Sequence, residues 1–184
     1  MKFESIDEIY VANSNVRKKL LDLIAGLSAE EGDLPTENGK WTVSKIVEHL
    51  SKVEDSMMRI CRKLLTKAKE KGLAADRSVK ISEHFIDSLR GVVSEGTRLE
   101  APAIVQPEGG QSFAESVVML ESTRKELERM RGMFDEWDST AFSFPHPAFG
   151  ALTALDWLVL IGGHESRHVA QIERILARKN AAKA

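Results

Sequence analysis

The chain has 184 residues, 42% of them hydrophobic and 29% charged, which is enough for one domain with a substantial core. Its 26 basic and 28 acidic side chains leave a net charge of −2, so nucleic-acid binding through a broad basic surface is not expected. Cys61 is the only cysteine, which excludes an intramolecular disulfide and favours a reducing compartment. The most apolar stretch is too short to span a membrane, and the N-terminus lacks the hydrophobic core of a signal peptide. We therefore expect a single domain over residues 1–184, located in the cytoplasm.

The first predicted helix follows Ser5. Ser5 and Glu8 have the spacing of a capping box, in which two residues satisfy each other's free backbone N–H groups at a helix start. Apolar residues then recur mostly at steps of three and four until about residues 26–28, as they do on one face of a helix. Ser28 and Glu31 repeat the capping-box spacing and predict one further helical turn before a loop.

The second predicted helix begins after Thr42, a residue type that caps helix N-termini well. An apolar stripe follows, and the basic residues within 67–71 suit the negative pole at the end of a helix. The periodicity then weakens over residues 73–111. Residues 81–93 predict a short helix. Residues 97–111 contain two prolines and a Gly-Gly pair, and they predict an irregular stretch that covers a core or frames a pocket.

A third helix is predicted from Ser112, where another capping box begins, to about Phe134. Residues 139–150 are rich in Phe and Pro and are predicted to form a loop. A capping box with Asp in place of Glu then starts a fourth helix, over residues 153–178. Four long amphipathic helices predict an all-α fold, a four-helix bundle.

Two histidines mark the fourth predicted helix. His164 and His168 are four residues apart, so their side chains lie one turn apart on the same side, where two imidazoles can bind one metal ion. They are also in phase with the apolar residues that should face the bundle interior. These residues are Trp157, Ile161, Ile172 and Ile175.

His49 on the second helix is likewise in phase with its apolar stripe. In an up-and-down bundle the second and fourth helices run in the same direction, so a modest stagger would bring His49 close to His164 and His168. Each histidine alone could be an ordinary core residue. Three inward imidazoles without partners are costly to bury, however, and a divalent metal ion would use their lone pairs. The sequence therefore predicts a metal site formed by His49, His164 and His168.

Three protein ligands leave one coordination position open for water or substrate. This is the pattern of a reactive metal site, because closed structural sites use four protein ligands. An ion in such a site activates water or polarises a substrate. Zinc and nickel both accept imidazole readily, so the prediction is a divalent ion, zinc or nickel, without a choice between them.

Glu165 is the candidate catalytic residue. Residues 164–168 match the H-E-x-x-H pattern of zinc proteases, in which the Glu is the general base. A protease of that type takes a third ligand farther along the chain, and only 16 residues follow His168. The protease interpretation is therefore disfavoured. Glu165 is then either a base or neighbour of the metal site, or a solvated residue on the helix face.

His146 is a candidate for lining the mouth of the site. It lies between Pro145 and Pro147 in the rigid loop before the fourth helix. The alternative is an ordinary loop histidine, since loop residues are usually solvated.

Four segments together resemble the DinB/YfiT-like superfamily of metalloenzymes. Residues 39–50 resemble the helix motif that ends in the family's first metal-binding His, and residues 164–172 resemble the last-helix motif that supplies the other two. Residues 101–107 are similar to the family's central extended segment. Residues 146–153 are similar to the start of its last helix.

The resemblance implies a four-helix bundle of DinB/YfiT-like type that holds a metal through three His and forms a homodimer. Relatives with known activities include bacillithiol transferases and mycothiol-dependent isomerases, and many others are described as metal-dependent hydrolases. We therefore expect an enzyme whose metal activates water or a low-molecular-weight thiol towards a small substrate. The alternative is a non-catalytic, metal-stabilised helical module for dimerisation or partner binding. No nucleic-acid or membrane partner is expected.

Overall fold

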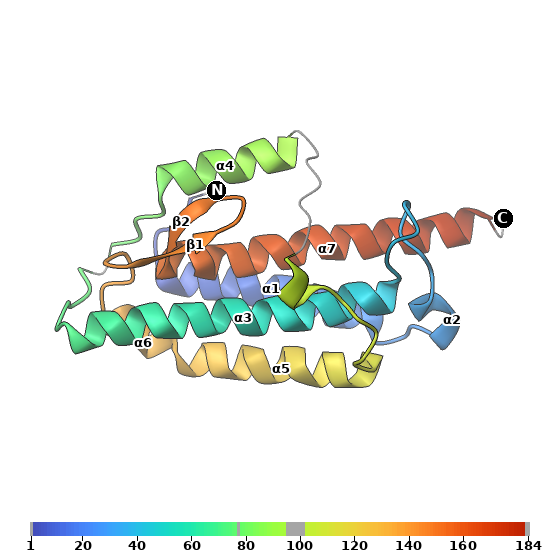
Figure 1. Ribbon diagram of the computed structural model, residues 1–184, viewed down its shortest axis with the longest axis horizontal. Coiled ribbons are helices and arrows are strands. Elements are labelled where there is room, and N and C mark those ends of the chain that lie inside the picture. Colours follow the sequence, from blue (N-terminus) through green and yellow to red (C-terminus); the bar gives the residue numbers. More distant parts are fainter. Residues whose placement is uncertain (1, 77, 95–101, 183–184) are drawn as a thin grey trace.

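The computed structural model describes residues 2–76, 78–94 and 102–182 and is helical almost throughout (Figure 1). Four long helices form a bundle, which confirms the predicted fold class. These are α1 (Ile6–Ile24), α3 (Val43–Glu70), α5 (Phe113–Arg129) and α7 (Ala154–Ala182). The shorter elements are α2 (Ala29–Gly32), α4 (Glu83–Ser94), the 3-10 turn η1 (Ala103–Val105), α6 (Arg131–Glu136), and the strands β1 (Ser143–His146) and β2 (Gly150–Thr153).

The helix starts follow the capping signals in the sequence. The predicted capping boxes at Ser28 and Ser112 are complete. At the start of α1, Ser5 accepts a hydrogen bond from the Glu8 N–H at 3.2 Å. The Glu8 carboxylate bonds to the Glu4 N–H, however, so this box is only half formed. The predicted turn after α1 is present as α2.

The directions of the helices differ from the up-and-down prediction. Cys61 of α3 contacts Ala154 of α7, and His49 of α3 contacts His164 of α7. Sequence numbers therefore rise along α3 as they fall along α7, and the two helices are antiparallel. The cause is the long connection from α3, through α4 and η1, to α5. It returns along the bundle, so that α5 starts at the same end as α3 and runs parallel to it (Figure 1).

Two elements between α5 and α7 differ from the prediction. One helix was expected as far as Phe134, but α5 and α6 are separate helices that meet at Met130. The predicted loop is instead a β-hairpin, in which β1 pairs antiparallel with β2. Pro145 and Pro147 argue against strands in this part of the sequence, because proline is disfavoured in strands and tolerated mainly at edges.

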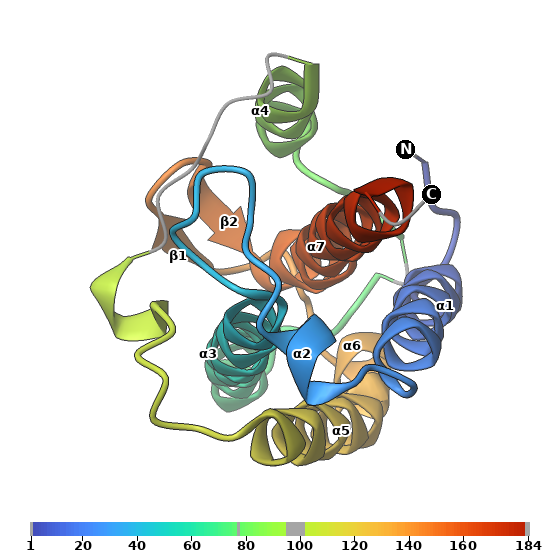
Figure 2. The same cartoon turned by 90° about the vertical axis from the view of Figure 1, so that its right-hand side faces the viewer.

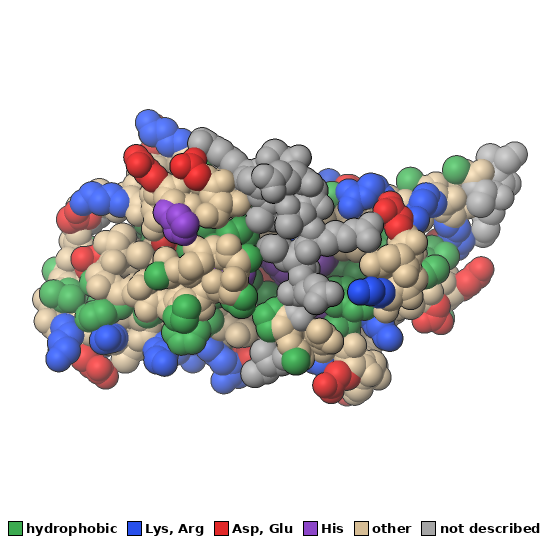
Figure 3. All heavy atoms as spheres, turned by 45° about the horizontal axis from the view of Figure 1, so that its top comes forward, with side chains coloured by type: hydrophobic (Ala, Val, Ile, Leu, Met, Phe, Trp, Pro, Cys, Tyr) green, Lys and Arg blue, Asp and Glu red, His purple; other side chains and the backbone are tan. Residues whose placement is uncertain are grey.

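The core lies between the four long helices, which surround it in the end-on view of Figure 2. Each of them contributes fully buried apolar side chains. The largest include Ile9, Tyr10, Leu20, Ile46, Leu65, Leu120, Leu127, Leu155, Leu158 and Ile172. On the face shown in Figure 3, basic and acidic side chains are interspersed. Within the described ranges, no helix combines the length and the apolar character needed to cross a membrane.

α1 packs closely against α7 at Gly162, where a Cβ atom would overlap Oδ1 of Asn13. Asn13 cannot easily turn away, because its Nδ2 donates to the Leu158 carbonyl at 2.9 Å. We expect Gly162→Ala to lower the free energy of unfolding by about 1–3 kcal/mol through overpacking. Gly163→Ala is the control, since its new Cβ would meet no atom within 4 Å beyond its own stretch of the helix. Urea unfolding compares them, and equal stability of the two variants would contradict the close approach.

Candidate metal centre

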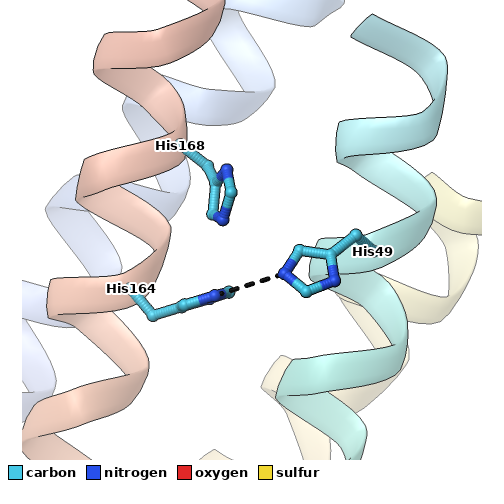
Figure 4. Close-up of side chains that lie close together, drawn as sticks. All are labelled: His49, His164 and His168. Atoms are coloured by element: carbon cyan, nitrogen blue, oxygen red, sulfur yellow. Dashed lines mark hydrogen bonds between the residues drawn. The ribbon is translucent and has the colours of Figure 1, made fainter. Parts of the chain in front are cut away.

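The three predicted histidines lie together between α3 and α7 (Figure 4). One ring nitrogen of each of His49, His164 and His168 lies within 4.8 Å of the other two, and the Nε2 atoms of His49 and His164 are 3.3 Å apart. Two nitrogens that bind one ion tetrahedrally at about 2.0–2.1 Å are separated by roughly this distance. His49 and His168 are buried, whereas His164 is partly exposed.

Hydrogen bonds on the far side of two of the rings fix their tautomers. His49 Nδ1 lies 2.8 Å from the Val105 carbonyl oxygen, and His168 Nδ1 lies 2.9 Å from Gln171 Oε1. Because these oxygens only accept, each Nδ1 carries the hydrogen and each Nε2 keeps a free lone pair. Metal-binding histidines typically have such partners, which orient the ring. The donor set therefore fits a divalent ion.

Burial keeps the three imidazoles neutral. Desolvation is the largest cause that lowers their pKa values, to about 3 for His168 and well below the usual value for His164. The pKa of His49 is lowered for the same reason. The positive charge of Arg167 adds to the effect at all three rings. A neutral imidazole is the form that binds metal, so the site needs little deprotonation near pH 7.

The cluster offers three ligands from the protein. Among the residues that the structure describes, no Asp, Glu or Cys joins the three histidines in the group. Three neutral ligands leave room for a water or a substrate at the ion, as in catalytic zinc sites.

Glu165, the candidate base, contacts arginines. One of its oxygens accepts from Arg17 Nε at 2.5 Å, and the other pairs with Arg124 Nη2 at 3.3 Å. Glu165 is only 2% exposed, so the alternative of a solvated residue on the helix face is wrong. Burial raises the pKa of this carboxyl, and Arg17 opposes that shift. Its role as a base stays a prediction, while its contacts favour a structural role.

Glu165 belongs to a buried ion cluster that was not predicted from the sequence. The cluster consists of Arg17, Glu54, Arg124 and Glu165, one residue from each long helix. Arg17 also pairs with Glu54, and Arg124 Nη2 lies 3.1 Å from the other Glu54 oxygen. Two positive and two negative groups leave the cluster neutral, which makes its burial tolerable.

The predicted irregular stretch borders the histidine site. It includes η1, and η1 supplies the Val105 carbonyl that holds His49. Residues 97–101 of the same stretch lie outside the described residues.

His146 ends β1 and shapes the hairpin turn. Its Nδ1 accepts from the N–H groups of Ala148 and Phe149 at 3.1 and 3.3 Å, and its ring stacks on Phe149. Burial lowers the pKa of His146. A place at the mouth of the site stays a prediction.

Cys61 is enclosed in the core. Its Sγ lies 3.6 Å from the Ala154 carbonyl, and burial raises the pKa of the thiol. We expect no reaction of the native protein with a chromogenic aromatic disulfide at pH 8, and reaction of one thiol per chain in urea. Rapid labelling of the native protein would contradict this burial. Any thiol used at the histidine site must then come from another molecule.

Residues 12–172 match the family model of the DinB superfamily. The chain is also similar to the uncharacterised protein YuaE of Bacillus subtilis strain 168. The two are 23% identical over 157 residues, which cover 83% of this chain and 87% of YuaE.

Two solved structures share the fold. TT2238, a four-helix bundle protein, aligns with a TM-score of 0.59 at 24% identity, over 91% of this chain and 98% of its own. YfiT from Bacillus subtilis, described as a probable metal-dependent hydrolase with an unusual four-helix bundle topology, aligns with a TM-score of 0.58 at 20% identity. That alignment covers 98% of this chain and 93% of YfiT.

Proposed function

The chain belongs to the DinB superfamily, and from this membership and its histidine site we propose that it is a metal-dependent hydrolase of small substrates. The observation that carries the proposal is the group of three neutral imidazoles without a carboxylate or thiolate ligand among the described residues. The description of YfiT as a probable metal-dependent hydrolase supports the same class of reaction.

In this proposal His49, His164 and His168 hold the ion, and each other residue has a defined task. Val105 and Gln171 keep two of the rings in the tautomer that binds metal. A divalent ion, zinc or nickel, supplies Lewis-acid polarisation of the substrate and makes water or a thiol more acidic. The neutral ligands leave the positive charge of the ion uncompensated, so that it can act on a developing anion.

The proposal is tested by metal-dependent turnover. Zinc-loaded and nickel-loaded protein is assayed on nitrophenyl esters, phosphate esters and amides, and on an electrophilic fluorophore with a low-molecular-weight thiol. We expect turnover in at least one water-consuming assay, its loss in metal-free protein and its loss in His168→Ala. Turnover only in the thiol assay would shift the function to a thiol transferase.

A non-catalytic module predicts a different outcome: removal of the metal lowers the melting temperature, and no assay shows turnover at any metal loading. That result would overturn the enzyme proposal. A homodimer and a cytoplasmic location stay predictions, and light scattering of the purified protein tests the first.

A further inference from the structure

A buried carboxylate ties the segment of residues 102–109 to α3. Glu48 is only 2% exposed, and each of its oxygens accepts a separate backbone hydrogen bond. Oε1 accepts from the Glu108 N–H at 3.2 Å, and Oε2 accepts from the Gly109 N–H at 3.0 Å. Lys52 Nζ lies 2.9 Å from Oε1.

The same segment reaches the metal centre. Val105 lies three residues before Glu108, and its carbonyl accepts the hydrogen bond from His49 Nδ1. Between these contacts, the Gln106 carbonyl accepts from Lys52 Nζ at 3.2 Å. The backbone group that orients His49 therefore belongs to a segment that the neighbouring residue of α3, Glu48, holds in place.

We propose that Glu48 is a positioning residue of the metal centre. It fixes the segment 102–109. The segment in turn holds the His49 ring so that its Nε2 faces the ring nitrogens of the other two histidines, where the three could share one ion. This inference rests on the proposed metal site. Coupling of this kind is reciprocal: if the anchored segment raises metal affinity, then metal must stabilise the anchored segment by the same factor.

The first test is zinc affinity. Glu48→Gln keeps the size of the side chain, but an amide has one acceptor oxygen and one NH2 donor, so one of the two N–H groups faces a donor. We expect zinc to bind about tenfold more weakly, the lower end of the effect of partners that orient a ligand. Asp55→Asn is the control, since it removes a carboxylate that pairs with Arg59 on the same helix. Its affinity should equal that of the wild type.

The second test separates positioning from the loss of a nearby negative charge. Hydrogen exchange is followed at the Glu108 and Gly109 amides, and zinc should slow it about tenfold in the wild type, as reciprocity requires. Gly109→Ala leaves the Glu48 charge intact. Because Gly109 has φ +76° and no atom within 4 Å of an added Cβ, the substitution strains only the anchored backbone. Without zinc, exchange at the two amides should be about tenfold faster in Gly109→Ala than in the wild type, and zinc should slow it again. Exchange in Gly110→Ala should match that of the wild type.

Three outcomes decide the inference. Wild-type zinc affinity in a folded Glu48→Gln variant would overturn it, and so would exchange at Glu108 and Gly109 that zinc does not change. If Glu48→Gln does not fold, the exchange of the wild type and of Gly109→Ala decides alone. A wild-type protein that binds no zinc or nickel would overturn the proposed metal centre as well, and the wild-type titration shows this before any variant is compared.

Discussion

Replacing Arg17 by methionine is expected to lower the free energy of unfolding by about 3–5 kcal/mol. Arg17 is 5% exposed, ion-paired with Glu54 and Glu165, and also donates from Nη1 to the Leu120 carbonyl at 2.7 Å. Methionine has a similar length but no charge. It leaves two buried carboxylates with Arg124 as their remaining partner in the cluster, and an uncompensated buried charge is strongly destabilising.

The control for this prediction lies on the same helix. Lys19 pairs with Glu173 at 2.8 Å, but the two side chains are 59% and 42% exposed, so Lys19→Met should cost less than about 1 kcal/mol. Urea unfolding at pH 7 measures both variants. A loss below about 1 kcal/mol for Arg17→Met would contradict the importance of the ion cluster.

The loss of unfolding free energy caused by Arg17→Met should also become smaller as the pH falls from 7 towards 5. Burial already raises the pKa of Glu165, and the variant lacks the Arg17 charge that opposes this shift. A carboxyl whose pKa is higher in the folded protein than in the unfolded chain favours folding below that folded pKa, where it is protonated, and loses this advantage as the pH rises.

His168→Ala is expected to weaken zinc binding by more than about 100-fold, because loss of a partner that merely orients a ligand already costs about 10–100-fold. The effect can be read as stability. Zinc at about a thousand times the wild-type Kd should raise the free energy of unfolding by about 4 kcal/mol. In His168→Ala the same zinc concentration should add less than about 1.4 kcal/mol. Equal stabilisation of both proteins would show that zinc binds elsewhere.

The metal-free proteins should differ in their response to acid. The pKa of His168 is about 3 in the folded protein, against about 6.5 in an unfolded chain. As the pH falls below about 6.5, the unfolded chain takes up a proton at this residue and the folded protein does not. This ring alone therefore costs the wild type about 1.4 kcal/mol of stability per pH unit, or about 2 kcal/mol by pH 5. Urea unfolding at pH 7 and pH 5 should show a smaller loss in His168→Ala.

The histidine site could be predicted because helical periodicity alone puts its residues on inward faces. His164 and His168 share a face of one helix, and His49 lies on the apolar face of another. The directions of those helices could not be predicted in the same way, because an apolar stripe is the same whichever way its helix runs. The direction of α5 depends on the path of the connection before it, and contacts such as Glu48 with Gly109 join residues far apart in the sequence.

The buried ion cluster did leave a signal in the sequence. Each of its charged residues lies three or four positions from a buried apolar residue of its own helix, as Arg17 does from Leu20 and Glu54 does from Leu50. Two basic and two acidic residues thus lie within apolar stripes of four helices. Their pairing could not be derived from the pattern, because it depends on which helices are neighbours in space. For the same reason the ion pairs of Glu165 with Arg17 and Arg124 could not be predicted.

The metal content of the purified protein decides whether the three histidines bind an ion. The wild type is loaded with zinc or nickel, freed of unbound ion by gel filtration and measured by plasma mass spectrometry, beside a His49→Ala, His164→Ala double variant. The three-histidine site predicts one ion per wild-type chain and none in the double variant. A wild-type protein without stoichiometric metal after loading would contradict it.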